Sequence, residues 1–223
     1  EVVGLAGLMG AGRTELAMSL FGHAYGQKIS GEVYMKGKKV EMRSVRAAID
    51  NNLAYVSEDR KTYGLVLIDS ITFNMSLAAL RRFFSERGVV DERKEAVKAE
   101  EYRRLINVKT ATMEQPVGSL SGGNQQKVVL AKWMLTQPDV LILDEPTRGI
   151  DVGAKYEIYS VINDLAKSGK AIIIISSEMP EIIGTCDRTY VINEGAIAGE
   201  LVGSAMTQEA IMGCIMAHNR KGE

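Results

Sequence analysis

The chain has very little cysteine. Its 223 residues include only Cys186 and Cys214, too few and too far apart for a disulfide framework or a metal-binding knuckle. Long hydrophobic runs are also missing, because the longest unbroken aliphatic run is 171–175 and a membrane-spanning helix needs about 20 apolar residues. The formal net charge is −1, so no basic field is present to recruit nucleic acid. These absences exclude disulfide-rich and membrane-spanning classes and give no support to a nucleic-acid-binding class.

The first residues have the character of a strand that already lies inside a domain. Residues 1–5 contain neither an initiator Met nor a leader. We therefore expect the chain to be part of a longer polypeptide. With 46% apolar and 25% charged residues, its composition is otherwise that of an ordinary globular protein.

Short apolar runs alternate with helical segments over much of the chain, a pattern typical of parallel strands buried on both faces. The predicted strands are Val2–Ala6, Leu53–Ser57, Val140–Leu143, Ala171–Ser176 and Tyr190–Asn193. Helices are predicted over 13–21 and 153–167, and a hairpin over 31–38. This pattern predicts an α/β fold with a mainly parallel sheet and a partial antiparallel β subdomain.

The segment from about 70 to 137 differs in composition from the rest. Charged, helix-forming stretches dominate it, including 77–84 and 92–106, and it contains no β-rich run. The sequence therefore predicts two domains. A core made of 1–69 and 138–223 is interrupted by a helical subdomain, 70–137.

A glycine-rich loop joins the first predicted strand to the first predicted helix. It consists of Gly7, Leu8, Met9, Gly10, Ala11, Gly12, Arg13 and Thr14. This fits the phosphate-loop spacing G-x-x-x-x-G-K-[ST], except that Arg13 stands where Lys is expected. Such a loop cradles phosphates with backbone N–H groups at a helix N-terminus, and Thr14 supplies a hydroxyl for Mg²⁺. The motif alone is also compatible with a plain glycine-rich turn.

Two acids follow the apolar strand 140–143 directly. The strand would deliver Asp144 to the carboxyl edge of the sheet, where α/β proteins bind their ligands. Asp144 is expected to hold Mg²⁺ through water. Glu145 is expected to orient or deprotonate an attacking water beside the terminal phosphate. The alternative, two exposed acids at the start of a loop, does not explain the aliphatic run before them.

A second glycine-rich motif decides the family. It consists of Leu120, Ser121, Gly122, Gly123, Asn124, Gln125 and Gln126. In this order with the phosphate loop and the acid pair, it resembles the signature of the ATP-binding domain of ABC transporters, over nearly the whole chain. The resemblance implies a P-loop ATPase core, ATP and Mg²⁺ as cofactors, and a signature that contacts ATP held by the opposite domain of a head-to-tail pair. Ser121 is expected to cap the helix that begins there.

Further motifs narrow the resemblance to the second ATPase domain of carbohydrate importers of the ribose, galactose and xylose kind. These are 55–61 with Gly64-Leu65, Asn124, 147–153 and 176–180. The resemblance implies transmembrane permease subunits as partners, indirectly an extracytoplasmic sugar-binding protein, and a peripheral location at the cytoplasmic face of the cell membrane. It implies that Asp151 bridges the two ATPase domains.

Three positions depart from the family pattern. Glu58 stands where a lid-loop Gln is usual and could still bind metal-bound water. Glu178 stands where a His usually contacts the terminal phosphate, and an ionised carboxylate repels phosphate. With Arg13, these changes predict a weakened nucleotide site in a chain whose Glu145 and signature are intact.

Two function classes follow, and a third lacks support. The leading hypothesis is an energy-coupling ATPase of a sugar importer, with Glu145, Glu178 and Glu58 at its catalytic positions. The alternative is a regulatory module that binds ATP without hydrolysing it. A soluble ABC protein of translation or DNA repair would need a basic face or a long coiled-coil insertion, and the sequence has neither.

Overall fold

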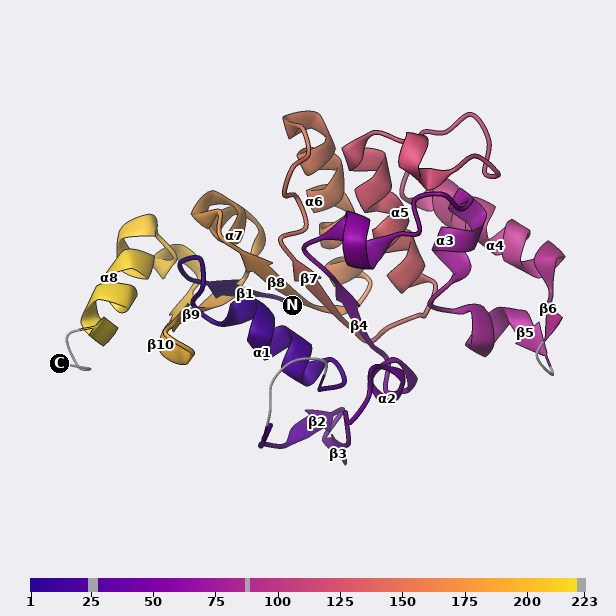
Figure 1. Cartoon of the computed structure of the whole chain (residues 1–223). Coiled ribbons are helices and arrows are strands. Elements are labelled where there is room, and N and C mark those ends of the chain that lie inside the picture. Colours follow the sequence, from indigo (N-terminus) through magenta and orange to yellow (C-terminus); the bar gives the residue numbers. More distant parts are fainter. Residues whose placement is uncertain (24–27, 87–88, 220–223) are drawn as a thin grey trace. The chain divides into compact units, whose positions relative to one another are not determined.

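The computed structural model describes residues 1–23, 28–86 and 89–219 (Figure 1). It divides into two compact units. The first consists of Glu1–Tyr55, Asp139–Pro146 and Ile162–Glu223, and the second of Val56–Pro138 and Thr147–Val161. None of the described helices is long and apolar enough to cross a bilayer.

The first unit is built on a six-stranded sheet in the order β10-β9-β1-β8-β7-β4. Its strands are β1 (Val2–Ala6), β4 (Leu53–Val56), β7 (Val140–Asp144), β8 (Ala171–Ser176), β9 (Arg188–Asn193) and β10 (Ala196–Val202). β1 pairs in parallel with β8 and β9, and β7 pairs in parallel with β8. The predicted mainly parallel α/β fold is confirmed. The strand β10, which pairs antiparallel with β9, is not predicted from the sequence.

Parallel pairing brings the carboxyl ends of three strands to one edge of the sheet. Ala6 of β1 is in register with Ser176 of β8, and Asp144 of β7 is in register with Ile175. The residues before these ends are buried aliphatics, including Ile142, Leu143 and Ile174. Polar residues that follow each strand therefore gather along the same edge.

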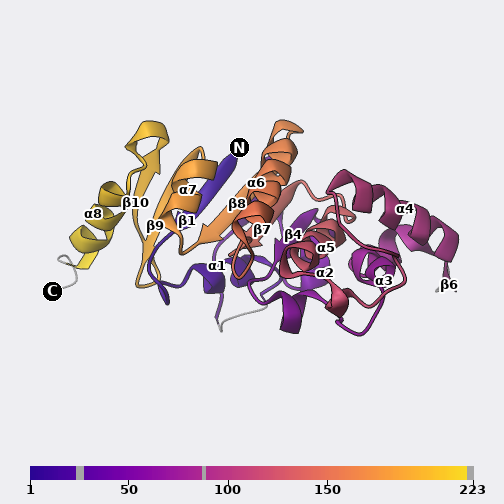
Figure 2. The same cartoon turned by 90° about the horizontal axis from the view of Figure 1, so that it is seen from above.

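Helices cover the sheet of the first unit on both faces. They are α1 (Arg13–Leu20), α2 (Val45–Asp50), α7 (Met179–Thr185) and α8 (Gln208–Asn219), with the turn η4 (Gly203–Ala205) before α8. Figure 1 shows α1 and α7 on opposite faces. Figure 2 shows α8 beside β10, and α8 contacts β9 and β10. The predicted hairpin is confirmed as β2 (Val33–Met35) paired antiparallel with β3 (Lys38–Val40).

The second unit is mostly helical. Its elements are η1 (Arg60–Gly64), α3 (Ile71–Ser76), η2 (Leu80–Phe84), β5 (Ser85–Glu86), β6 (Val89–Val90), α4 (Glu92–Leu105), η3 (Val117–Ser119) and α5 (Gly122–Met134). The first part of α6 (Val152–Lys167) also belongs to it. α3 packs against α4 and α5, and Ile71, Met75 and Val129 are fully buried.

The helix predicted over 77–84 has the wrong bounds. The Ser70 hydroxyl accepts a hydrogen bond from the Phe73 N–H at 3.1 Å, so a helix starts at Ile71 and ends at Ser76. A separate π-helical turn, η2, then covers Leu80–Phe84. The only pairing of strands described in this region is a short antiparallel one between β5 and β6. The helix predicted over 92–106 is confirmed as α4.

Candidate nucleotide site

The loop between β1 and α1 turns through left-handed backbone at Gly10 (φ 78°) and Gly12 (φ 95°). Only glycine adopts such angles at little cost. The loop is closed by a hydrogen bond from the Ala11 N–H to the Leu8 carbonyl at 3.1 Å. It is also tied to the β9–β10 turn, because the Gly195 N–H donates to the Ala11 carbonyl at 2.9 Å. Gly195 is a positioning residue that no sequence motif revealed.

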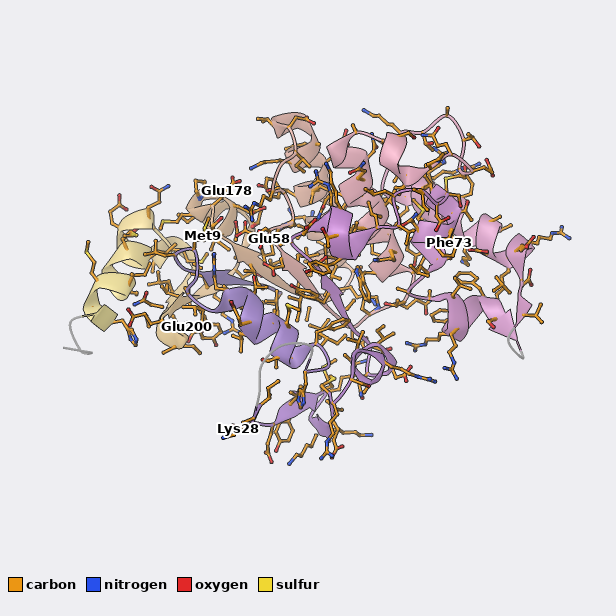
Figure 3. All side chains as sticks on the ribbon, in the orientation of Figure 1. Met9, Lys28, Glu58, Phe73, Glu178 and Glu200 are labelled. Carbon is orange, nitrogen blue, oxygen red and sulfur yellow. The ribbon has the colours of Figure 1, made fainter. Side chains whose placement is uncertain are left out.

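Gly12 occupies the N-cap of α1 and provides no side-chain cap. The first N–H groups of a helix need an acceptor, and an anion serves as one. Met9 at the tip of the loop is 83% exposed and labelled in Figure 3. The loop therefore has the open, donor-rich form that binding of a phosphate chain requires.

Asp144 is completely buried at the end of β7. The Tyr55 hydroxyl donates to its Oδ2 at 2.8 Å, whereas its Oδ1 has no hydrogen-bond partner among the described residues. Burial raises the pKa of Asp144, and hydrogen bonds from Tyr55 and Thr14 and the charge of Arg13 oppose that rise. A buried carboxylate oxygen without a partner is costly, so this atom is suited to an absent ligand.

These donors fit Mg²⁺, which prefers oxygen ligands and keeps several waters. Thr14 and Asp144 provide a hydroxyl and a carboxylate at one place. Among the described residues, no group of three or more His, Cys, Asp or Glu side chains could hold a metal. An ion here would therefore rely on Thr14, Asp144, water and the phosphates of a nucleotide.

Glu145 has a left-handed backbone, with φ at 47°. That conformation is uncommon for a non-glycine residue and more so before proline. Its N–H donates to the Ile175 carbonyl at 2.9 Å, and its Oε1 accepts from the Ser177 N–H at 2.7 Å. Burial raises the pKa of Glu145, opposed by the Ser177 hydrogen bond and by Arg13. A strained, oriented carboxylate with a raised pKa is suited to accept a proton.

Arg13 points to this carboxylate. Its Nη2 lies 3.8 Å from Glu145 Oε1, and its side chain is 8% exposed. Its Nη1 donates to the Ser176 carbonyl. The guanidinium is thus engaged at the carboxyl ends of β7 and β8. To bind a phosphate chain, the guanidinium would have to give up its contacts with Glu145 and the Ser176 carbonyl.

Glu178 lies at the same edge, as the N-cap of α7. Its N–H donates to the Ser176 hydroxyl at 3.0 Å, and its side chain makes no cap hydrogen bond. β1 and β8 pair in register, so the loops that carry Met9 and Glu178 leave the sheet at the same edge (Figure 3). The structure therefore brings the phosphate loop, the acid pair and Glu178 together in the first unit.

Glu58 belongs to the second unit, where its carboxylate forms an ion pair with Arg148. Arg60 lies beside it and donates to the carbonyls of Arg148 at 3.0 Å and Gly149 at 3.4 Å. A cavity of about 310 Å³ opens next to these residues. The sequence identifies Arg60 only as part of a motif, whereas in the structure its side chain donates to the loop that precedes Asp151.

Asp151 marks the start of α6 in the second unit. Its Oδ1 accepts from the Ala154 N–H at 3.0 Å. A side chain at Gly123 would place its Cβ 2.5 Å from the Ala154 Cβ, so α5 and α6 approach each other here as only glycine allows. This close contact explains the second glycine of the signature.

Ser121 occupies the N-cap of α5, but its side chain makes no cap hydrogen bond. The expectation that its hydroxyl caps the helix is therefore wrong, because the hydroxyl accepts from Asn124 Nδ2 at 3.0 Å instead. Leu120 and Gln125 are buried, and Gln125 Nε2 donates to the Leu120 carbonyl at 3.1 Å. A cavity of about 320 Å³ beside Ser121 is also lined by Lys109, Asn124 and Asp151.

A model of the family described as "ABC transporter" matches residues 1–148. The chain belongs to the ABC transporter family. The resemblance to the ATP-binding domain of ABC transporters is confirmed, and the fold is that of ABC ATP-binding cassettes. That the chain is the second ATPase domain stays a prediction.

Curated relatives are named as ATP-binding proteins of sugar transport or import. The chain is 57% identical over 212 residues to the L-arabinose transport ATP-binding protein AraG of Geobacillus stearothermophilus. It is 53% identical over 214 residues to the xylose import ATP-binding protein XylG of Geobacillus kaustophilus, and 49% identical over 212 residues to the ribose import ATP-binding protein RbsA of Clostridium tetani. These matches cover 95–96% of this chain but 41–42% of those proteins, so the chain spans about two fifths of their length.

Solved structures agree in fold at low identity. A nucleotide-free ATP-binding cassette from an ABC transporter gives a TM-score of 0.76 at 17% identity, over all of this chain and 87% of that one. A dimeric post-hydrolysis cassette bound to ADP and phosphate gives 0.74 at 18% identity, over 91% and 85%. Both are ABC cassettes, as the chain's own motifs indicate.

Removing the Tyr55 hydroxyl should raise the pKa of Asp144 further. Tyr55→Phe deletes the donor that favours the ionised carboxylate, and burial then acts with less opposition. The pKa of Asp144 in the folded state lies above the unfolded value of 3.8. Between these two pKa values the folded state binds more protons than the unfolded state, so the free energy of unfolding falls as pH rises. The variant should extend this pH range to higher pH. Carboxyl titration by NMR, with unfolding free energy measured against pH, checks this.

Tyr34→Phe is the matched control, since that hydroxyl donates to the exposed Glu32. It should leave the Asp144 titration unchanged. An Asp144 pKa that stays constant or falls in Tyr55→Phe would show that the hydroxyl does not stabilise the ionised form.

Proposed function

We propose that this chain is the ATP-hydrolysing domain of a sugar importer, and that it forms one half of a head-to-tail pair of ATPase domains. Family membership and relatives named as arabinose, xylose and ribose import proteins support this. The chain spans about two fifths of the length of those proteins. We propose that it is the second ATPase domain of a longer polypeptide.

In this proposal the phosphate loop Gly7–Thr14 binds the phosphates, and Thr14 and Asp144 hold Mg²⁺. The ion, when bound, would neutralise charge on the phosphates. Glu145 orients the attacking water and accepts its proton. The Ser177 N–H fixes the orientation of the carboxylate, and the pKa raised by burial favours proton transfer to it. Glu58 and Glu178 remain predicted catalytic residues, and Glu58 a predicted ligand of metal-bound water.

The chain's own site is proposed to be the weaker of two. The observation that carries this is the position of Arg13, which pairs with Glu145 and donates to the Ser176 carbonyl. Lys would place a compact charge on the phosphates, whereas the longer planar guanidinium extends to the catalytic carboxylate. Leu120–Gln125 then complete the ATP site of the partner domain, and Asp151 contributes to the interface between the domains.

The remaining partners follow from the importer assignment. We propose that transmembrane permease subunits hold the chain at the cytoplasmic face of the cell membrane and that an extracytoplasmic binding protein delivers the sugar. The helical subdomain 70–137 would meet the permease, and 1–69 with 138–223 would form the ATPase core. No nucleic-acid partner is proposed, given a net charge of −1.

A regulatory module that binds ATP without hydrolysis is the second candidate. The Arg13–Glu145 contact favours it, since a carboxylate engaged by a guanidinium is a poorer base. The two candidates differ in turnover and therefore can be separated by experiment.

Glu145→Gln separates them in the purified chain. An ATPase should lose roughly 10²–10⁴-fold in turnover, the usual contribution of a general base, while a binding module has no turnover to lose. Glu200→Gln is the control, because Glu200 pairs with Arg188 on β9–β10 and not with Arg13. A wild-type chain that binds ATP and releases no phosphate would favour the binding module.

Ser121→Ala should damage transport more than Arg13→Ala. A hydroxyl bound to an ionised phosphate contributes about 1.5–3 kcal/mol, which is roughly 10- to 150-fold in rate, whereas Arg13 belongs to the weaker site. Sugar uptake by the full-length polypeptide assembled with its permease measures both, with the exposed Ser204→Ala as control. A larger loss in Arg13→Ala would contradict the proposed asymmetry.

A further inference from the structure

The signature serine is held in an unusual way for a helix N-cap. Ser121 has N-cap backbone angles (φ −60°, ψ 156°), yet its hydroxyl accepts no hydrogen bond from the helix backbone. It accepts one instead from the Asn124 side chain, with 3.0 Å between Oγ and Nδ2. The first N–H groups of α5, a 13-residue helix, therefore have no side-chain cap.

The orientation of the Asn124 amide is determined by its other contact. The Lys109 N–H donates to Asn124 Oδ1 at 2.8 Å. A backbone N–H needs an acceptor, so the amide oxygen must face Lys109 and Nδ2 must face Ser121. Nδ2 can only donate, which makes the Ser121 oxygen the acceptor. The hydroxyl proton therefore points away from Asn124.

The backbone around Lys109 is itself anchored. Lys127 is 2% exposed, donates to the Asn107 carbonyl at 2.7 Å and pairs with Glu157. Lys109 Nζ lies 3.8 Å from the same Glu157 carboxylate. The N–H that holds Asn124 is thus part of a network that links the 107–109 turn to α5 and α6.

We propose that Asn124 is a positioning residue that fixes Ser121 as a hydrogen-bond donor toward an anionic ligand. The inference rests on the proposed role of the signature in the partner's ATP site. By taking Ser121 Oγ away from the helix backbone, Asn124 leaves the N–H groups at the start of α5 available to the same phosphate. The hydroxyl proton and these N–H groups then act on one ligand in the cavity beside Ser121.

Asn124→Asp tests this with little change of shape. One carboxylate oxygen still accepts from the Lys109 N–H, but the donor that faced Ser121 becomes an acceptor. The Ser121 hydroxyl then donates to Asp and its proton turns inward. ATP hydrolysis by the full-length polypeptide assembled with its permease should fall about as far as in Ser121→Ala, by 10-fold or more. Asn124→Ala frees the hydroxyl and removes the acceptor of the Lys109 N–H without giving the hydroxyl a new acceptor, so hydrolysis should fall less.

The double variant Ser121→Ala/Asn124→Asp separates orientation from charge. If Asn124 acts through the hydroxyl, adding Asp to the Ser121→Ala background lowers hydrolysis no further. If the new negative charge merely repels phosphate, it lowers hydrolysis in both backgrounds, and the inference is overturned. Asn163→Asp places the same charge on an exposed position of α6, outside the network around Asn124, and should leave hydrolysis unchanged.

The remaining outcomes distinguish this inference from the proposed function. If Asn124→Asp leaves hydrolysis unchanged while Ser121→Ala lowers it, the inference is overturned and the proposed function is not. A harmless Ser121→Ala overturns the use of the signature and the inference with it. Thermal unfolding of each variant shows whether it folds. If Asn124→Asp does not fold, Asn124→Ala still tests the inference, because hydrolysis at the wild-type rate in Asn124→Ala would refute the positioning role.

Discussion

Parallel pairing of β1, β8 and β7 is the constraint on which the candidate site depends. The register sets Ala6 beside Ser176 and Asp144 beside Ile175, so the residues that follow each strand share one edge. The phosphate loop, the acid pair and Glu178 are each attached to one of these strands. Backbone hydrogen bonds thus determine where the polar groups meet, and the buried aliphatic strands keep that edge rigid.

Two groups contact the Glu145 carboxylate, and one of them is a cation that a phosphate would also attract. The carboxylate accepts from the Ser177 N–H and lies beside the Arg13 guanidinium. The first contact fixes the orientation of the carboxylate, and the second partly neutralises its negative charge. Phosphate binding would attract the same guanidinium, so nucleotide and Glu145 compete for one cation. An Arg at position 13, in place of the Lys expected there, therefore affects the charge on Glu145 as well as the phosphate loop.

Much of the first unit was predictable because its signals are local. Buried strands appear as runs such as Val140–Leu143, and glycines at 10 and 12 mark a loop that needs left-handed angles. The helix predicted over 77–84 was wrong because a Ser70 cap starts a helix at Ile71, and composition alone does not register the end of that helix at Ser76. β10 was missed because its alternation is weak and β9 supplies its hydrogen bonds.

By itself, the sequence determined the family and the α/β class, and it predicted which residues carry phosphate-binding, metal-binding and signature chemistry, because motif spacing and apolar runs are properties of short segments. The tertiary structure alone decided which partners those residues take. Arg13 turns to Glu145 and Ser176, Tyr55 donates to Asp144, and Ser121 is held by Asn124 instead of capping its helix. The contacts of Arg13 and Tyr55 join residues whose separation depends on strand register, and Asn124 is oriented by the Lys109 N–H from outside its helix. A hydrogen bond forms only where folding brings a donor within about 3 Å of its acceptor.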